Sequence, residues 1–316
     1  MSAWNQADCL AGDKLQQDIC GWFSPPDPWT NHNIARELRQ VGTAEWFIQG
    51  STFSEWKSSG WNSVLWIHGK REFHPAIAPF QRLITFSPFV AGSGKSVFWY
   101  VNFPIFPSLE LTIWASSTII EGIDALRKSG LASLAMFYYD FREDQKKDRR
   151  GLLSSMLVQL CLQSNSYYSI IHKFYLEHGN GSRQPTEDAI LRYLKDIVEL
   201  PGQAPIFLIV DALDECPNTS ALASSRKKVL HILKELINLQ VRSLRICVTS
   251  RPEADIKAVL EPLSFRSVSL HDESGQKEDI KNYIKSIVST HEKMRRWKEE
   301  NKDLVIDVLT ERADGM

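Results

Sequence analysis

The sequence lacks a net charge of one sign, because its 37 lysines and arginines are balanced by 38 aspartates and glutamates. Without a basic field to attract nucleic acid or an acidic membrane surface, we expect neither partner. Cysteine is also scarce. The five cysteines are widely spaced and form no C-x-x-C pair, which argues against a disulfide framework and against a zinc site. A reducing cytoplasm is the simplest setting for such a chain.

A secretory signal is also missing, since the first residues, MSAWNQADCLAGDKLQQ, show no basic region followed by an apolar stretch. The longest mostly apolar run, 97–115, contains Pro104, Pro107 and Glu110, and no second such run accompanies it. Prolines and a carboxylate are poorly tolerated inside a bilayer, so we predict no membrane-spanning segment. The composition, 43% apolar and 24% charged, is typical of a folded soluble protein.

Short apolar runs alternate with amphipathic helical patterns along most of the chain. The run 64–67 predicts a buried strand, and further strands are predicted within LASLAMFYYDF, APIFLIVDALDEC, SLRICVTSRP and FRSVSL. Helices are predicted between them, the first over STIIEGIDALRKSG from Ser117. Strands that are apolar throughout and separated by helices predict an α/β fold with a doubly wound parallel sheet. A helical N-terminal lead, residues 1–45, and a helical C-terminal end complete the prediction.

The strand predicted at 206–210 ends in a group of acidic residues. Asp211 follows it directly, and Asp214 and Glu215 come shortly afterwards. A carboxylate at the tip of a buried strand is costly unless it is satisfied, and a magnesium ion with its waters is the usual solution. We therefore predict Asp211 as a metal ligand, and Asp214 and Glu215 as carboxylates that orient or deprotonate an attacking water. A strand that ends in a solvated acidic loop is the alternative for this motif alone.

The strand predicted at 244–248 ends in Thr249, Ser250, Arg251 and Pro252. A hydroxyl and a guanidinium at this tip can contact the terminal phosphate of a nucleotide, because arginine is suited to forked phosphate contacts. An ordinary capped turn before the next helix explains the same residues about as well.

A phosphate-binding motif supports the first of these alternatives. The segment GSGKS comprises Gly92, Ser93, Gly94, Lys95 and Ser96. Small residues let successive backbone amides converge on a phosphate, while the lysine reaches the outer phosphates and the serine hydroxyl reaches the metal. The GKS triplet, the acidic strand tip and the arginine strand tip follow one another in the order of a P-loop NTPase. ATP or GTP with Mg²⁺ is the predicted ligand.

Several segments together resemble a known family, the NACHT domain of fungal NLR-like proteins of the STAND NTPase class, whose start is described as nephrocystin-3-like. The resemblance covers residues 20–316 and is carried by DPWTNHNIARELR, GTAEWFIQGSTFSEWKSSG, FYYDFREDQKKDRRGLLSSMLVQL, LIVDALDEC and LRICVTSRPEADI. It implies that residues 46–316 form a NACHT-type domain that acts as the signalling switch of a receptor through the binding and hydrolysis of a nucleoside triphosphate.

The same resemblance assigns roles to individual residues. It implies Lys95 and Ser96 in the phosphate loop, Asp211 on magnesium, Asp214 and Glu215 in hydrolysis and Arg251 as the phosphate sensor. It also implies self-association through the NACHT domain. Members of the family continue into a winged helix and repeats, which we do not find before residue 316. Two alternatives to the switch stay open: a non-catalytic self-association scaffold, and the inactive product of an imperfect gene model.

The phosphate loop departs from the family pattern in one respect, because Phe89 stands where its opening glycine belongs. Gly69 and Lys70 follow the first strand, as the start of the loop should, but residues 71–90 separate them from Gly92. A second block, 99–115, separates the GKS triplet from the helix that should follow it, and its two prolines prevent a helix there.

Both blocks have the properties of short retained introns. Each can be encoded with an intron-like start and a terminal AG, and each removal preserves the reading frame. The joined chain, in which one proline replaces residues 71–91 and one cysteine replaces 99–116, reads GKPGSGKSVFCSTII. Two genuine insertions that inactivate or regulate the loop are the competing explanation.

Overall fold

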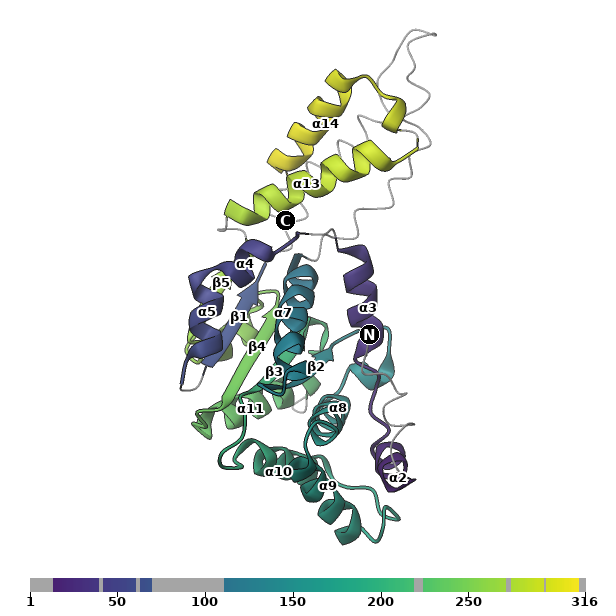
Figure 1. Cartoon of the computed structure of the whole chain (residues 1–316), viewed down its shortest axis with the longest axis vertical. Helices are drawn as coiled ribbons and strands as arrows, with labels where there is room; N and C mark the ends of the chain where they lie inside the picture. The colour runs from purple at the N-terminus through teal and green to yellow at the C-terminus, as the bar shows by residue number, and fades with distance from the viewer. Residues whose placement is uncertain are drawn as a thin grey trace.

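A five-stranded parallel sheet forms the centre of the molecule (Figure 1). The computed structural model describes residues 14–39, 42–60, 63–69, 111–218, 224–270, 274–292 and 294–312. Its strands lie in the order β2-β3-β4-β1-β5, and every pairing between them is parallel. Their bounds are β1 Ser63–His68, β2 Ser133–Tyr138, β3 Ile206–Asp211, β4 Leu244–Ser250 and β5 Arg266–Ser269. The predicted α/β fold with a parallel sheet is confirmed, and it is consistent with a P-loop NTPase.

Helices flank this sheet and extend from both of its ends. In chain order they are α2 Lys14–Phe23, α3 Trp29–Leu38, α4 Glu45–Gln49, α5 Ser51–Ser58, α7 Leu111–Lys128, α8 Arg149–Cys161, α9 Asn165–Glu177, α10 Glu187–Val198, α11 Ser225–Asn238, α12 Ala254–Leu260, α13 Ser274–Thr290 and α14 Glu299–Arg312. Figure 1 shows α13 and α14 as a hairpin that projects beyond one end of the sheet.

The strands form where the sequence is apolar on both faces. All six residues of β2 and of β3, and all seven of β4, are buried, as expected for strands covered by helices on both sides. Helix α8 is buried all round from Gly151 to Cys161, whereas other helices, such as α10, bury one side. In α10, the Thr186 hydroxyl accepts a hydrogen bond from the Ala189 amide, and apolar residues from Ile190 to Val198 pack inward.

The connections between strands define where a ligand is expected. From β1 the chain passes through α7 to β2, beyond β4 and β3, and it then returns through β3 and β4 to β5 on the other side of β1. The direction of the connections thus reverses after β1. Because such connections are right-handed, α7, which leads from β1 to β2, covers one face of the sheet, and the helices of the returning connections cover the other. Ligands of doubly wound sheets bind at this reversal, beyond the carboxyl ends of the strands.

Some helices differ from the sequence prediction. Helix α7 begins at Leu111, six residues before the predicted start at Ser117, so that residues 111–115 of the second expected insert are helical. Helices α4, α5 and α9 were not predicted. In α9 the side-chain oxygen of Ser164 caps the amide of Ser166, a local signal that the aromatic and β-branched residues of this segment obscure.

Two further expectations concern membranes and cysteines. Within the described ranges, no helix combines the length and the apolar character required to cross a bilayer. Cys161, Cys216 and Cys247 are buried free thiols. Cys20 is disulfide-bonded, which the number and spacing of the cysteines did not predict.

Candidate functional site

The carboxyl ends of β3 and β4 bring the predicted residues Asp211 and Thr249 together. Asp211 is the last residue of β3 and is 1% exposed. Thr249 lies on the neighbouring strand β4, and its hydroxyl donates a hydrogen bond to Asp211 Oδ1. The same hydroxyl oxygen accepts a hydrogen bond from the Ala212 amide at 3.0 Å. The hydroxyl of Thr249 thus fixes both the carboxylate and the first backbone amide beyond the strand.

A tight turn follows Asp211 and directs the acidic residues back toward β4. Ala212 adopts a left-handed conformation with φ 54° and ψ 44°, and a single 3-10 turn spans Leu213–Glu215. Asp214 Oδ1 accepts a hydrogen bond from the Arg251 amide at 3.0 Å, and its Oδ2 lies 3.3 Å from Arg251 Nε. Asp214 and Arg251, predicted to have separate roles, therefore form one ion pair across the two strand ends.

Replacing Ala212 with glycine is expected to raise the free energy of unfolding by up to about 1 kcal/mol, because the left-handed region is unfavourable for a residue with a Cβ atom. Urea unfolding measures the change. Ala135→Gly, in the interior of β2, is the matched control and is expected to destabilise by about 1 kcal/mol. Equal destabilisation by both changes would contradict the strained turn.

Glu215 is turned away from this ion pair. Its Oε2 accepts a hydrogen bond from the Phe141 amide at 3.2 Å, in the loop that follows β2. The Phe141 ring itself is 62% exposed. The two carboxylates expected to share a catalytic role therefore bind different loops: Asp214 the β4 exit and Glu215 the β2 exit.

A buried arginine that we did not predict from the sequence joins the loops that follow β3 and β4. Arg226, in the first turn of α11, is 4% exposed. Its Nε donates to the Cys216 carbonyl at 2.8 Å, and its Nη2 donates to the Asp214 carbonyl at 2.5 Å. Its Nη1 pairs with Glu253 beyond β4. Arg226 thus ties the β3 exit to the β4 exit, next to the pair of Asp214 and Arg251.

Tyr138 and His32 border the same edge from β2 and α3. Tyr138 is the register partner of Asp211, and its hydroxyl lies 3.0 Å from His32 Nδ1. Burial, and secondarily the charge of Asp211, raise the pKa of Tyr138. Burial lowers the pKa of His32 to about 4. At neutral pH both rings are uncharged, so this pair adds hydrogen-bonding groups and no charge beside Asp211.

The remaining predicted residues lie on or beyond β1. Gly69 follows β1 directly, and β1 is adjacent to β4 in the sheet. Gly92, Ser93, Gly94, Lys95 and Ser96, with both expected inserts except residues 111–115, lie outside the described residues. Within the described ranges, no group of three or more His, Cys, Asp or Glu side chains could hold a metal ion. The predicted magnesium site therefore depends on Asp211 together with the phosphate loop.

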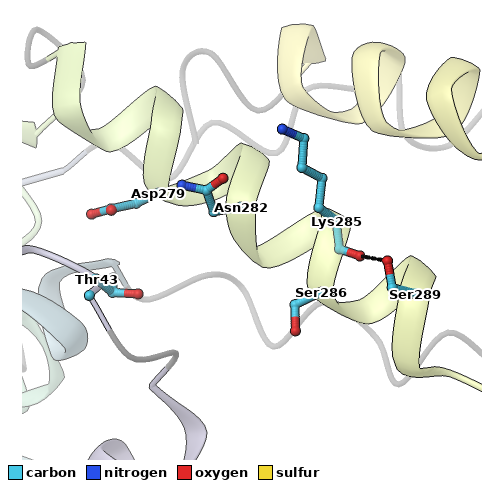
Figure 2. Close-up of a pocket in the computed structure, with 7 residues that line it drawn as sticks. Thr43, Asp279, Asn282, Lys285, Ser286 and Ser289 are labelled. Atoms are coloured by element: carbon cyan, nitrogen blue, oxygen red, sulfur yellow. Dashed lines mark hydrogen bonds between the residues drawn. The ribbon is translucent and has the colours of Figure 1, made fainter.

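A polar cleft of about 380 Å³ lies between α13 and the segment before α4 (Figure 2). Figure 2 shows Thr43 on one side and Asp279, Asn282, Ser286 and Ser289 of α13 on the other. Asp279 holds the two parts together, since its Oδ2 accepts hydrogen bonds from the Ala44 amide at 2.8 Å and the Trp46 indole at 2.9 Å. Burial raises the pKa of Asp279.

The cleft lies at the same end of the sheet as Asp211. The Thr118 hydroxyl, near the start of α7, donates to the Thr43 carbonyl at 3.2 Å. Ser116, two residues earlier on α7, hydrogen-bonds to Tyr138, the register partner of Asp211. These contacts connect the cleft to the carboxyl edge through the first turns of α7.

Comparison with known families agrees with this assignment of the fold. The parallel sheet flanked by helices is consistent with a P-loop NTPase-like fold. The model of the nephrocystin 3 N-terminal family matches residues 113–251, from the first turn of α7 to Arg251. This segment is therefore a nephrocystin-3-like region, as the sequence predicted. No curated protein matches the chain.

Proposed function

We propose that this protein is a NACHT-type NTPase of the STAND class that binds ATP or GTP with Mg²⁺ and serves as the signalling switch of an NLR-like receptor. One observation carries the proposal: β4 lies between β1 and β3, so that Gly69, Thr249 and Asp211 lie at the carboxyl ends of three adjacent strands. Neighbouring strands in a sheet are about 4.8 Å apart, so the ends of β1 and β3 lie about 10 Å apart on either side of β4, a separation that phosphates and a bridging magnesium ion would span.

The start of α7 supports the joined chain as the nucleotide-binding form. Counting back from Ser117 in that chain, the helical positions 111–116 are filled by Gly94, Lys95, Ser96, Val97, Phe98 and the junction cysteine. The helix would then begin at the Gly94–Lys95 step, where its free amides and dipole favour phosphate. In the chain as written, Leu111 and Thr112 occupy these first positions, and we expect weak binding or none.

The residues of the carboxyl edge supply distinct contributions to the proposed switch. Asp211 would hold the metal ion, which neutralises phosphate charge, and Thr249 keeps that carboxylate in place. The Arg251 side chain is 33% exposed, so a terminal phosphate could contact it. That contact would replace its ion pair with Asp214. Loss of the terminal phosphate restores that pairing, which is how hydrolysis would move the β4 exit.

The cleft next to Thr43 suits the nucleoside part of the ligand, because it opens at the same end of the sheet. We further propose a cytoplasmic protein that self-associates through this domain, as the family resemblance implies.

Nucleotide binding to the joined chain tests the proposal. Lys95→Ala is expected to weaken magnesium-dependent binding of a fluorescent ATP or GTP analogue at least about tenfold, since a hydrogen bond to a charged phosphate contributes about 1.5–3 kcal/mol. Lys234→Ala, an exposed lysine on α11, is the matched control and should leave the affinity unchanged. Equal affinity of the Lys95 variant and the parent would refute the site.

A further inference from the structure

One edge of the sheet is closed by side chains instead of a strand. Among the described strands β2 pairs with β3 alone, so its outer backbone groups face away from the sheet. If such an edge were left uncovered, it would be a template for pairing with another chain. The sequence of β2, SLAMFY, is buried along its full length and carries no charge that would discourage such pairing.

Two glutamines of the α8 segment bind the outer groups of β2 in pairs. Gln159 Oε1 accepts from the Met136 amide at 3.1 Å, and its Nε2 donates to the Met136 carbonyl at 2.7 Å. Gln163 makes the same two hydrogen bonds two residues away along the strand. Its Oε1 accepts from the Leu134 amide at 2.9 Å, and its Nε2 donates to the Leu134 carbonyl at 2.5 Å. Each side-chain amide therefore takes the place of a backbone amide on a neighbouring strand.

The spacing of the two glutamines matches the spacing of the strand. Residues four apart on a helix are separated by about 6 Å along its axis, and residues two apart on a strand by about 6.6 Å. Gln159 and Gln163 thus align with Met136 and Leu134 when the helix runs antiparallel to the strand. Strand residues two apart present their outward backbone groups on the same side, so the pairs form a regular ladder.

The ladder is buried at Gln159, in α8, and half-buried at Gln163, which follows the end of that helix. Gln159 is 3% exposed, and its Nε2 also lies 3.0 Å from the Ser155 hydroxyl. Gln163 Nε2 also donates to the Gln159 carbonyl at 2.8 Å. Removing a side-chain amide would leave one buried donor and one buried acceptor of β2 without a partner, each at a cost of about 1–3 kcal/mol.

We propose that Gln159 and Gln163 close the β2 edge of the sheet, and that without them this edge pairs with the β2 edge of a second copy of this chain. A second copy is the fitting partner because two identical edge strands, related by a twofold axis, present the same apolar face and the same outer groups to one another. The pairing would satisfy the groups of Leu134 and Met136 that the glutamines leave.

The test compares the parent full-length chain with Gln159→Leu, Gln163→Leu and the double variant, which keep side-chain bulk and remove the amides. In sedimentation velocity, the double variant is expected to associate at least about tenfold more tightly than the parent. An infrared band of intermolecular β-sheet should grow with protein concentration. Met156→Ala, which truncates a buried apolar side chain of the same helix and removes no side-chain amide, controls for general destabilisation.

Three results would overturn the proposal. The double variant could keep the association state of the parent, or Met156→Ala could associate equally at the same loss of thermal stability. If the double variant fails to fold, the association of Gln163→Leu is compared with that of the parent instead. In the parent, the amides of Leu134 and Met136 should be as protected from hydrogen exchange as those of β4, and rapid exchange at both would refute the ladder.

Discussion

Replacing Arg226 with methionine is expected to lower the free energy of unfolding by about 3 kcal/mol, the largest loss that we predict for a single side chain of the candidate site. The guanidinium is almost fully buried and donates to two carbonyls and to Glu253. Methionine fills a similar volume but leaves these acceptors without donors, and removing one partner of a buried ionic group costs about 3–5 kcal/mol. The Glu253 side chain is 43% exposed, so water can solvate it when its partner is removed. The expected loss in the free energy of unfolding is therefore at the lower end of this range.

The matched control is Arg192→Met on α10. Arg192 is exposed, and its guanidinium lies 5.3 Å from the Tyr193 ring centre, so its loss should cost less than about 0.5 kcal/mol. Arg226→Lys keeps the charge without the forked geometry and should fall between the two. Urea denaturation of all three variants measures these differences.

Hydrogen exchange gives a second, local measurement of the same change. The Arg251 amide, bound to Asp214 Oδ1, should lose protection in Arg226→Met before the centre of β4 does, because Arg226 holds the two exit loops together. Uniform loss of protection along β4 would show that Arg226 stabilises the whole sheet without holding these loops in particular.

The strands and their type could be predicted from the sequence because burial on both faces leaves a local signature. Runs such as IFLIV, residues 206–210, are apolar at every position, as expected for the strands of a parallel sheet covered on both faces. The order of the strands carries no such signature. That β4 lies between β1 and β3, and so brings Thr249 against Asp211, depends on contacts between residues 38 positions apart.

The candidate site was predictable to the level of residue type and strand end. Asp211, Asp214, Glu215, Thr249 and Arg251 all lie at or just beyond the carboxyl ends of β3 and β4, and this much came from the sequence. Their pairing did not, because the direction of each side chain depends on the left-handed turn at Ala212. Neither an alanine in that conformation nor the burial of one arginine in SRKK has a signal in a single sequence.

The start of α7 illustrates a different limit. A helix was predicted only from Ser117, since the prolines and mixed pattern before it gave no reason to extend the helix into residues 111–115. The structure extends it, and this places six helical positions where the joined chain would carry the end of the phosphate loop. Under the proposed function, nucleotide binding depends on which residues fill the first turn of α7.

Thermal melting of the chain as written and of the joined chain, each with and without a magnesium nucleotide, tests this account most directly. At a nucleotide concentration of 100 times Kd, binding adds about 2.7 kcal/mol, and a domain of this size gains about 2–4 °C per kcal/mol. We therefore predict a rise in Tm of about 5–10 °C for the joined chain, lost on Lys95→Ala, and no rise for the chain as written. A joined chain that gains no stability from either ATP or GTP would contradict the proposed nucleotide site, and an equal rise for both chains would contradict the proposal that the inserts disable it.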